Sequence, residues 1–124
     1  MDGKVMYIED EAFFAGIIKK KLEEKSYEVD IFGDGESGLV AAQAGGYQLI
    51  LLDLILPKLD GLEVLRLLKE NPETKNIPVI ILSNQSEEDN RKKALSLGAK
   101  AYYVKVNAMP GEIVKMVEGL LTKN

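Results

Sequence analysis

Five short runs of apolar residues alternate along the chain with longer segments in which apolar positions recur every three or four residues. The runs cover 5–8, 29–32, 49–52, 79–82 and 102–104. The third and fourth runs are almost continuously aliphatic, which is typical of strands covered on both faces of a sheet. We therefore expect five strands of a parallel sheet.

The segments between these runs have the spacing of amphipathic helices. They cover 11–25, 36–44, 62–68, 87–97 and 112–121. In the first, Phe14, Ile18 and Leu22 lie on one stripe with lysines and glutamates opposite. Five repeats of strand and helix predict an α/β domain: a doubly wound, five-stranded parallel sheet with helices on both faces. No linker or repeat divides the chain, so we expect one domain over 1–124.

The composition narrows the classes of function. The 124 residues carry a net charge of −4, which argues against direct binding of nucleic acid or of an anionic membrane. No apolar run reaches the length of a membrane span, and the N-terminus lacks the apolar core of a signal peptide. These features predict a cytoplasmic protein without membrane contact.

Cysteine and histidine are both absent from the chain. Their absence excludes disulfides, thiolate catalysis, serine–histidine triads and the common ligands of transition metals. Carboxylates, hydroxyls, carbonyls and lysines remain, and these groups suit a hard cation such as Mg²⁺ and phosphoryl chemistry.

Polar residues that could carry such chemistry follow four of the five runs. Glu9 and Asp10 follow the first, Asp53 the third, Ser83 the fourth and Lys105 the fifth. In an open parallel sheet, ligands bind beyond the carboxyl ends of the strands. The sequence therefore predicts a site in which these five side chains share one rim.

Each of these residues also has a purely structural explanation. Asp10 could cap the first helix, Ser83 could end a strand with Ser86 as the next helix cap, and Asp53 could bind loop amides. Taken together these explanations require several acids to share one edge by accident. A divalent cation would relieve the mutual repulsion of the acids, and an aspartate can serve as the nucleophile of phosphoryl transfer.

At this point the sequence resembles the receiver domains of two-component response regulators, as in the bacterial chemotaxis regulator. The resemblance rests on "YIEDE", "LLDLILPKLDG", "ILSNQ" and "LGAKAYYVK", which occur in order over the whole chain. It implies a flavodoxin-like sheet with strand order 2-1-3-4-5. It also implies that Asp53 accepts a phosphoryl group from a phosphohistidine of a sensor kinase or phosphotransfer protein.

The resemblance assigns a role to each matching residue. Asp10 and Asp53 would bind Mg²⁺ directly, Glu9 through a water, and Ile55 through its backbone carbonyl. Lys105 would pair with the phosphoryl group on Asp53.

Two further residues match the conformational switch of the family. Ser83 would sense the phosphoryl group, and Tyr102, not Tyr103, matches the switch aromatic. The face of the fourth helix, fifth strand and fifth helix would then change for a downstream protein or a fused output domain. The same face allows a weak homodimer.

The sequence departs from the family pattern near the site. Val106 stands where a proline, often after a cis peptide, usually follows the lysine, and Asn84 stands where a small residue is preferred. Ile55 and Gln85 occupy positions that tune hydrolysis of the acyl phosphate.

These departures motivate a second hypothesis, a protein-interaction module of the same fold that does not use phosphate. A Mg²⁺-dependent phosphatase is disfavoured, because Ile55 holds the place of its second aspartate. The resemblance implies a signalling domain that catalyses its own phosphorylation and slow dephosphorylation, and we do not count such a domain as an enzyme. The sequence leaves open whether the chain stands alone or is part of a longer protein.

Overall fold

The computed structural model describes residues 3–121, and its strands lie where the apolar runs predict them. They are β1 (Gly3–Ile8), β2 (Tyr27–Phe32), β3 (Leu49–Leu52), β4 (Val79–Ser83) and β5 (Ala101–Val104). Every neighbouring pair is parallel, and the order across the sheet is β2-β1-β3-β4-β5. The predicted fold class and strand order are confirmed.

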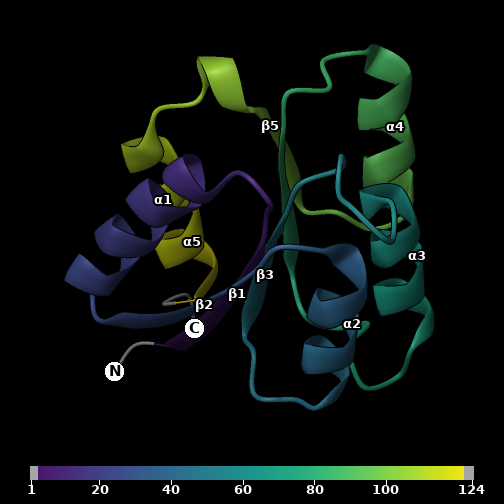
Figure 1. The fold of residues 1–124 in the computed structure, drawn as a ribbon, viewed down its shortest axis with the longest axis horizontal. Helices are drawn as coiled ribbons and strands as arrows, with labels where there is room; N and C mark the ends of the chain where they lie inside the picture. The colour runs from purple at the N-terminus through teal and green to yellow at the C-terminus, as the bar shows by residue number, and fades with distance from the viewer. Residues whose placement is uncertain (1–2, 122–124) are drawn as a thin grey trace.

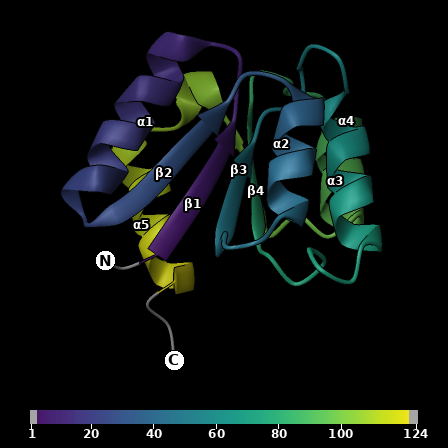
Figure 2. The same cartoon turned by 60° about the horizontal axis from the view of Figure 1, so that its bottom comes forward.

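Helices cover both faces of this sheet. They are α1 (Ala12–Glu24), α2 (Gly35–Gln43), α3 (Gly61–Glu70), α4 (Glu88–Ser96) and α5 (Pro110–Leu121). Figures 1 and 2 show α1 and α5 together on one face and α2, α3 and α4 on the other. The helix α5 begins two residues before the predicted start, at Pro110, because proline fits the first turn of a helix without losing a hydrogen bond. None of the described helices is long and apolar enough to cross a membrane.

The alternation of side chains along the strands divides the interior into two cores. Val5, Leu49 and Leu51 pack against α1 and α5, whereas Met6, Ile50 and others pack against α2, α3 and α4. Because both faces of β3 are covered, all four of its residues are buried. The sheet is therefore packed on both faces, and the loops at its carboxyl end follow well-packed strands.

The residues that precede α1 and α4 are not the ones considered above as helix caps, Asp10 and Ser86. Glu11, not Asp10, is the N-cap of α1, and its carboxylate accepts a backbone N–H of the first turn at 3.4 Å. Glu87, not Ser86, precedes α4. Asp60 occupies the N-cap position of α3 without a side-chain hydrogen bond. Asp10 therefore has no capping role that would explain its place on the rim.

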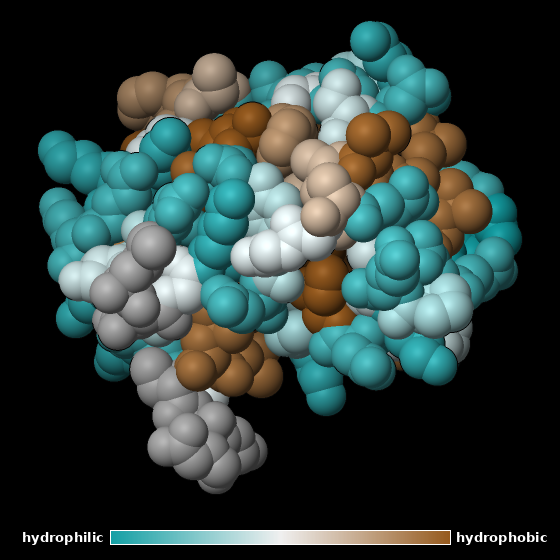
Figure 3. All heavy atoms as spheres, turned by 90° about the horizontal axis from the view of Figure 1, so that it is seen from below, coloured by the Kyte–Doolittle hydropathy of each residue, from teal (hydrophilic) through white to brown (hydrophobic). Residues whose placement is uncertain are grey.

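The two ends of the sheet differ in character. Figure 3 looks at the end where the strands begin, and this face is mostly hydrophilic with separate hydrophobic patches. At the opposite end, β5 runs into a short 3-10 helix, η1 (Lys105–Asn107), before α5. The side chains predicted to form a site come from the loops at this carboxyl end.

Candidate functional site

Two of the strand-end acids are held by extensions of the sheet's hydrogen-bond ladder. The backbone N–H of Asp53 donates to the carbonyl of Ile8 at 3.0 Å, and that of Glu9 donates to the carbonyl of Phe32 at 2.8 Å. Leu51, two residues before Asp53, packs toward α1 and α5. Since alternate residues share a face of a strand, the Asp53 side chain leaves β3 on that same side.

Lys105 joins two of the predicted acids. Its Nζ lies 2.5 Å from Oε1 of Glu9 and 3.1 Å from Oδ2 of Asp53. The side chain of Lys105 is only 9% exposed, that of Glu9 0% and that of Asp53 6%. The Phe14 ring lies under the same ammonium group, 5.5 Å from the ring centre. The structure thus brings Glu9, Asp53 and Lys105 into one buried cluster.

The charges of this cluster influence one another strongly. Burial raises the pKa of Glu9, and the neighbouring Asp53 charge adds to the rise while Lys105 opposes it. Burial alone would lower the pKa of Lys105, but its bonds to Glu9 and Asp53 outweigh that effect and raise it. Lys105 therefore stays charged at neutral pH. The cluster contains two acids, Glu9 and Asp53, and this one lysine.

Asp10 completes a donor set for a cation. Carboxylate oxygens of Glu9, Asp10 and Asp53 all lie within 4.8 Å of one another, and Asp10 is exposed to solvent. The cluster thus places three carboxyl groups against a single lysine. Clustered oxygen ligands with an exposed side fit Mg²⁺, which keeps several of its waters when it binds.

Ile55 lies beside this donor set. Its N–H donates to Oδ1 of Asp53 at 3.3 Å, and its side chain is 56% exposed. The binding of a metal by its carbonyl stays a prediction.

The predicted switch residues form a separate group on the other side of the rim. Ser83 is fully buried, and its Oγ accepts the N–H of Gln85 at 3.2 Å. The hydroxyl of Tyr102 donates to the carbonyl of Gln85 at 2.6 Å. Within residues 3–121, neither side chain hydrogen-bonds to the acid cluster. Ser83 and Tyr102 are thus linked through the loop after β4.

Two of the departures from the family pattern, Asn84 and Val106, lie at the surface. Asn84 is exposed and Val106 is 77% exposed. The described residues contain no cis peptide bond, so the Lys105–Val106 bond is trans and falls within η1. Lys105 reaches the acids in spite of the missing proline.

Two residues that shape the site were not identified from the sequence. The hydroxyl of Tyr7, a fully buried residue of β1, donates to Oε1 of Glu9 at 3.2 Å. A Cβ on Gly61 would lie 2.3 Å from the carbonyl oxygen of Asp53, so only glycine lets α3 start this close to the site. Tyr7 lies on β1 and Glu9 directly follows it, two positions later, and this spacing was a signal that could have revealed their contact.

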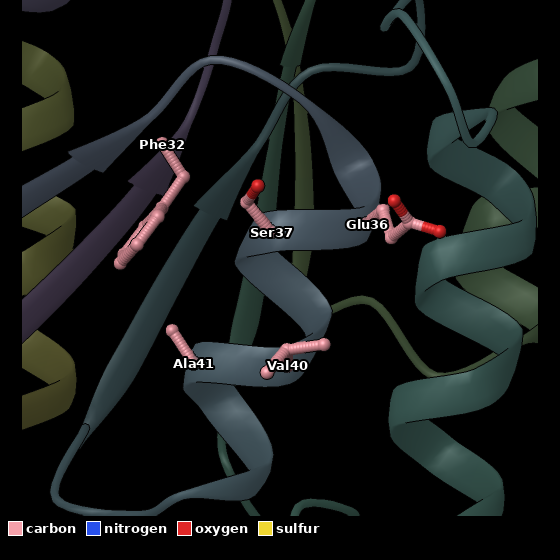
Figure 4. A pocket seen from close by; sticks show the side chains of 5 residues that line it. All are labelled: Phe32, Glu36, Ser37, Val40 and Ala41. Carbon is pink, nitrogen blue, oxygen red and sulfur yellow. The ribbon is translucent and has the colours of Figure 1, made fainter.

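A separate hollow lies beside α2. A pocket of about 530 Å³ between β2 and α2 is lined by Phe32 and four α2 residues, including Glu36 (Figure 4). Its lining carries a single acid and no lysine, so it does not share the chemistry of the rim.

Known proteins with similar sequences and folds share this arrangement of strands. The model of the response regulator receiver domain matches residues 5–118. Response regulator ArlR of Staphylococcus saprophyticus is 41% identical over 82% of this chain, and the match covers 45% of ArlR. The chain spans about half the length of the curated relatives it matches.

Two solved structures connect the fold with a metal and with phosphorylation. The Mn²⁺-bound form of response regulator Rcp1 is 29% identical, with a TM-score of 0.84 and coverage of 98% of this chain and 96% of that one. The phosphorylated cyanobacterial phytochrome response regulator RcpA is 33% identical, also with a TM-score of 0.84, covering 98% and 94%. With its sheet order, its rim of acids and a family match over nearly its whole length, the chain belongs to the response regulator receiver domains.

Proposed function

We propose that this chain is a phosphorylation-driven switch in which Asp53 accepts a phosphoryl group from a phosphohistidine of a sensor kinase or phosphotransfer protein. The observation that carries the proposal is the contact of Lys105 Nζ with Oδ2 of Asp53 at 3.1 Å in a buried cluster of acids. A carboxylate at the end of a buried strand is costly without a charged partner. The buried cluster fits a site in which Lys105 is already positioned beside the reacting carboxylate of Asp53.

In the proposed reaction, one carboxylate oxygen of Asp53 attacks the phosphorus atom. The new O–P bond forms as the N–P bond breaks, and the electron pair of that bond goes to the imidazole nitrogen of the donor. Lys105 would stabilise negative charge on the transferred group. Glu9, Asp10, Asp53 and the Ile55 carbonyl would hold Mg²⁺, which would supply positive charge to the phosphoryl oxygens.

The response to phosphorylation would pass through the other side of the rim. Ser83 would donate its hydroxyl to a phosphoryl oxygen, and a movement of the side chain toward that oxygen would lengthen the bond that Oγ now accepts from the Gln85 N–H. Tyr102, bonded to the Gln85 carbonyl, would follow the same loop. The changed face of α4, β5 and α5 would bind a downstream protein or an output domain, or a second copy of the chain.

Intact-mass measurement after incubation with Mg²⁺ and acetyl phosphate tests the proposal. The wild-type chain is expected to gain one phosphoryl group and Asp53→Asn none. Asp60→Asn is the matched control, because Asp60 is an exposed acid near the same loop and should leave phosphorylation intact. An Asp53→Asn chain that still gains the group, or a wild-type chain that never does, would contradict the proposal.

The second hypothesis, an interaction module that does not use phosphate, has less support. It rests on Asn84 and Val106, and both are exposed and leave the Lys105–Asp53 pair intact. It would be favoured if partner binding were the same for wild type and Asp53→Asn.

A further inference from the structure

The Glu9 carboxylate has a buried partner that the proposed reaction does not use. Tyr7 is 0% exposed, and its ring belongs to the core between the sheet and the pair α1 and α5. Its hydroxyl is the only polar atom of the side chain, and it donates to Oε1 of Glu9 at 3.2 Å. A tyrosine rather than a phenylalanine at this place adds one hydrogen bond to an acid of the site.

This bond is one end of a continuous chain of contacts. Oε1 of Glu9 accepts both the Tyr7 hydroxyl and Lys105 Nζ, and Lys105 Nζ also contacts Oδ2 of Asp53. The other oxygen of Glu9 accepts the N–H of Glu11 at 3.1 Å. The Glu9 carboxylate is thus fixed from three directions, and the position of Lys105 over Asp53 depends on it.

Glutamate needs such fixing more than aspartate would. Its side chain has one more rotatable bond, so holding the carboxylate in one position costs more conformational entropy. A buried donor at a fixed place on β1 reduces the number of positions open to the carboxylate. Partners of this kind orient ligands of metal sites and strongly affect their affinity.

We propose that Tyr7 is a positioning residue: its hydroxyl holds the Glu9 carboxylate where it can serve a divalent cation together with Asp10 and Asp53. The inference rests on the proposed function, because it concerns the same cation site. It goes further by giving a role to a core residue that would not touch the cation, the phosphoryl group or the donor. Raised by burial and by the charge of Glu9, the pKa of Tyr7 keeps the hydroxyl protonated as a donor.

Isothermal titration with Mg²⁺ alone tests this role. Tyr7→Phe removes only the hydroxyl and is expected to weaken Mg²⁺ binding about tenfold. Tyr47→Phe is the matched control, since Tyr47 also donates its hydroxyl to a carboxylate, that of Asp30 at 2.5 Å, but outside the acid cluster. It should bind Mg²⁺ like the wild type.

A double-mutant cycle separates positioning from a general effect on the fold. In a Glu9→Ala background, Tyr7→Phe should cause no further loss of Mg²⁺ affinity, and far-UV circular dichroism should be the same for all variants. Unchanged affinity in Tyr7→Phe, or an equal loss with and without Glu9, would overturn the inference. So would a wild-type chain that binds no Mg²⁺. Failure of the proposed function appears separately, as a chain that binds Mg²⁺ but is not phosphorylated at Asp53.

Discussion

The two sides of the rim are built differently, although both lie at the ends of neighbouring strands. On one side, the buried Lys105 side chain bonds directly to the carboxylates of Glu9 and Asp53. On the other side, the side-chain hydrogen bonds of Ser83 and Tyr102 within residues 3–121 go to the backbone of Gln85, at 3.2 and 2.6 Å. The first group is held by ion pairs, and the second by hydrogen bonds to a single loop residue.

This difference suits the two parts of the proposed switch. Phosphoryl transfer needs charges held in place before the reaction begins. A response needs an element that can change its arrangement at low cost in free energy, and a loop held by a few neutral hydrogen bonds meets that need better than a buried cluster of charges. We therefore expect substitutions in the acid cluster to affect stability and chemistry, and substitutions on the hydroxyl side to affect the response.

Removal of Lys105 should have the largest effect. In Lys105→Met the buried Glu9 and Asp53 lose their cation, and breaking a buried ion pair in this way costs about 3–5 kcal/mol of stability. Urea unfolding without Mg²⁺ measures the loss, and added Mg²⁺ should restore part of it. The exposed Lys115→Met on α5 is the control. Equal unfolding midpoints for the two variants would show that Lys105 is not the counter-ion of the cluster.

A methyl group at Gly61 should have the next largest effect. In Gly61→Ala the new Cβ would lie 2.3 Å from the Asp53 carbonyl oxygen, and such overpacking costs about 1–3 kcal/mol. Because the strain falls on Asp53 itself, phosphorylation by acetyl phosphate should slow as well. Gly16→Ala, where the methyl group meets open space, should not be destabilised. A Gly61→Ala chain as stable and as reactive as wild type would contradict this explanation.

Loss of the Tyr102 hydroxyl should have a smaller effect on stability and a distinct effect on the response. Tyr102→Phe gives up one hydrogen bond, worth about 1 kcal/mol, and leaves the acid cluster untouched. The chain should still be phosphorylated, but hydrogen exchange over residues 84–87 should respond less to it than in wild type. Tyr103→Phe, the neighbour on the opposite face, serves as control. A full response in Tyr102→Phe would remove Tyr102 from the switch.

The smallest expected effect is a change in pH dependence. Burial raises the pKa of Glu9 above its ordinary value of 4.5, so the contribution of Glu9 to stability is full below that value and is lost as the pH rises through the raised pKa. Without Mg²⁺, Glu9→Gln should therefore be more stable than wild type at pH 7, with the difference closing near pH 4. Urea midpoints across this range measure it, and a constant difference would argue against a buried, ionised Glu9.

The sequence predicted the fold well because aliphatic runs and helical spacing report burial directly. It also led to the acids and Lys105, because parallel strands end on one edge. The sequence could not predict tertiary contacts between elements that are distant along the chain. The approach of Gly61 to Asp53 and the place of Phe14 beneath Lys105 join different elements, and no local pattern marks them.

Tyr102 and Tyr103 illustrate a further limit. Alternation predicts that they lie on opposite faces of β5, and they do, Tyr102 toward α2, α3 and α4 and Tyr103 toward α1 and α5. Because both faces are covered, each tyrosine is half-buried, and the pattern alone could not give the degree of burial. The hydrogen bond from Tyr102 to the loop after β4 likewise depends on the path of that loop.

Lys105 and Asp53 stand 52 positions apart in the chain and meet only through the assembled sheet. A copy whose sheet has not assembled therefore lacks the pair, even though it contains both residues. Under the proposed function such a copy would take no phosphoryl group from its donor. Phosphorylation would thus be restricted to folded molecules, because the reactive pair exists only in the folded chain.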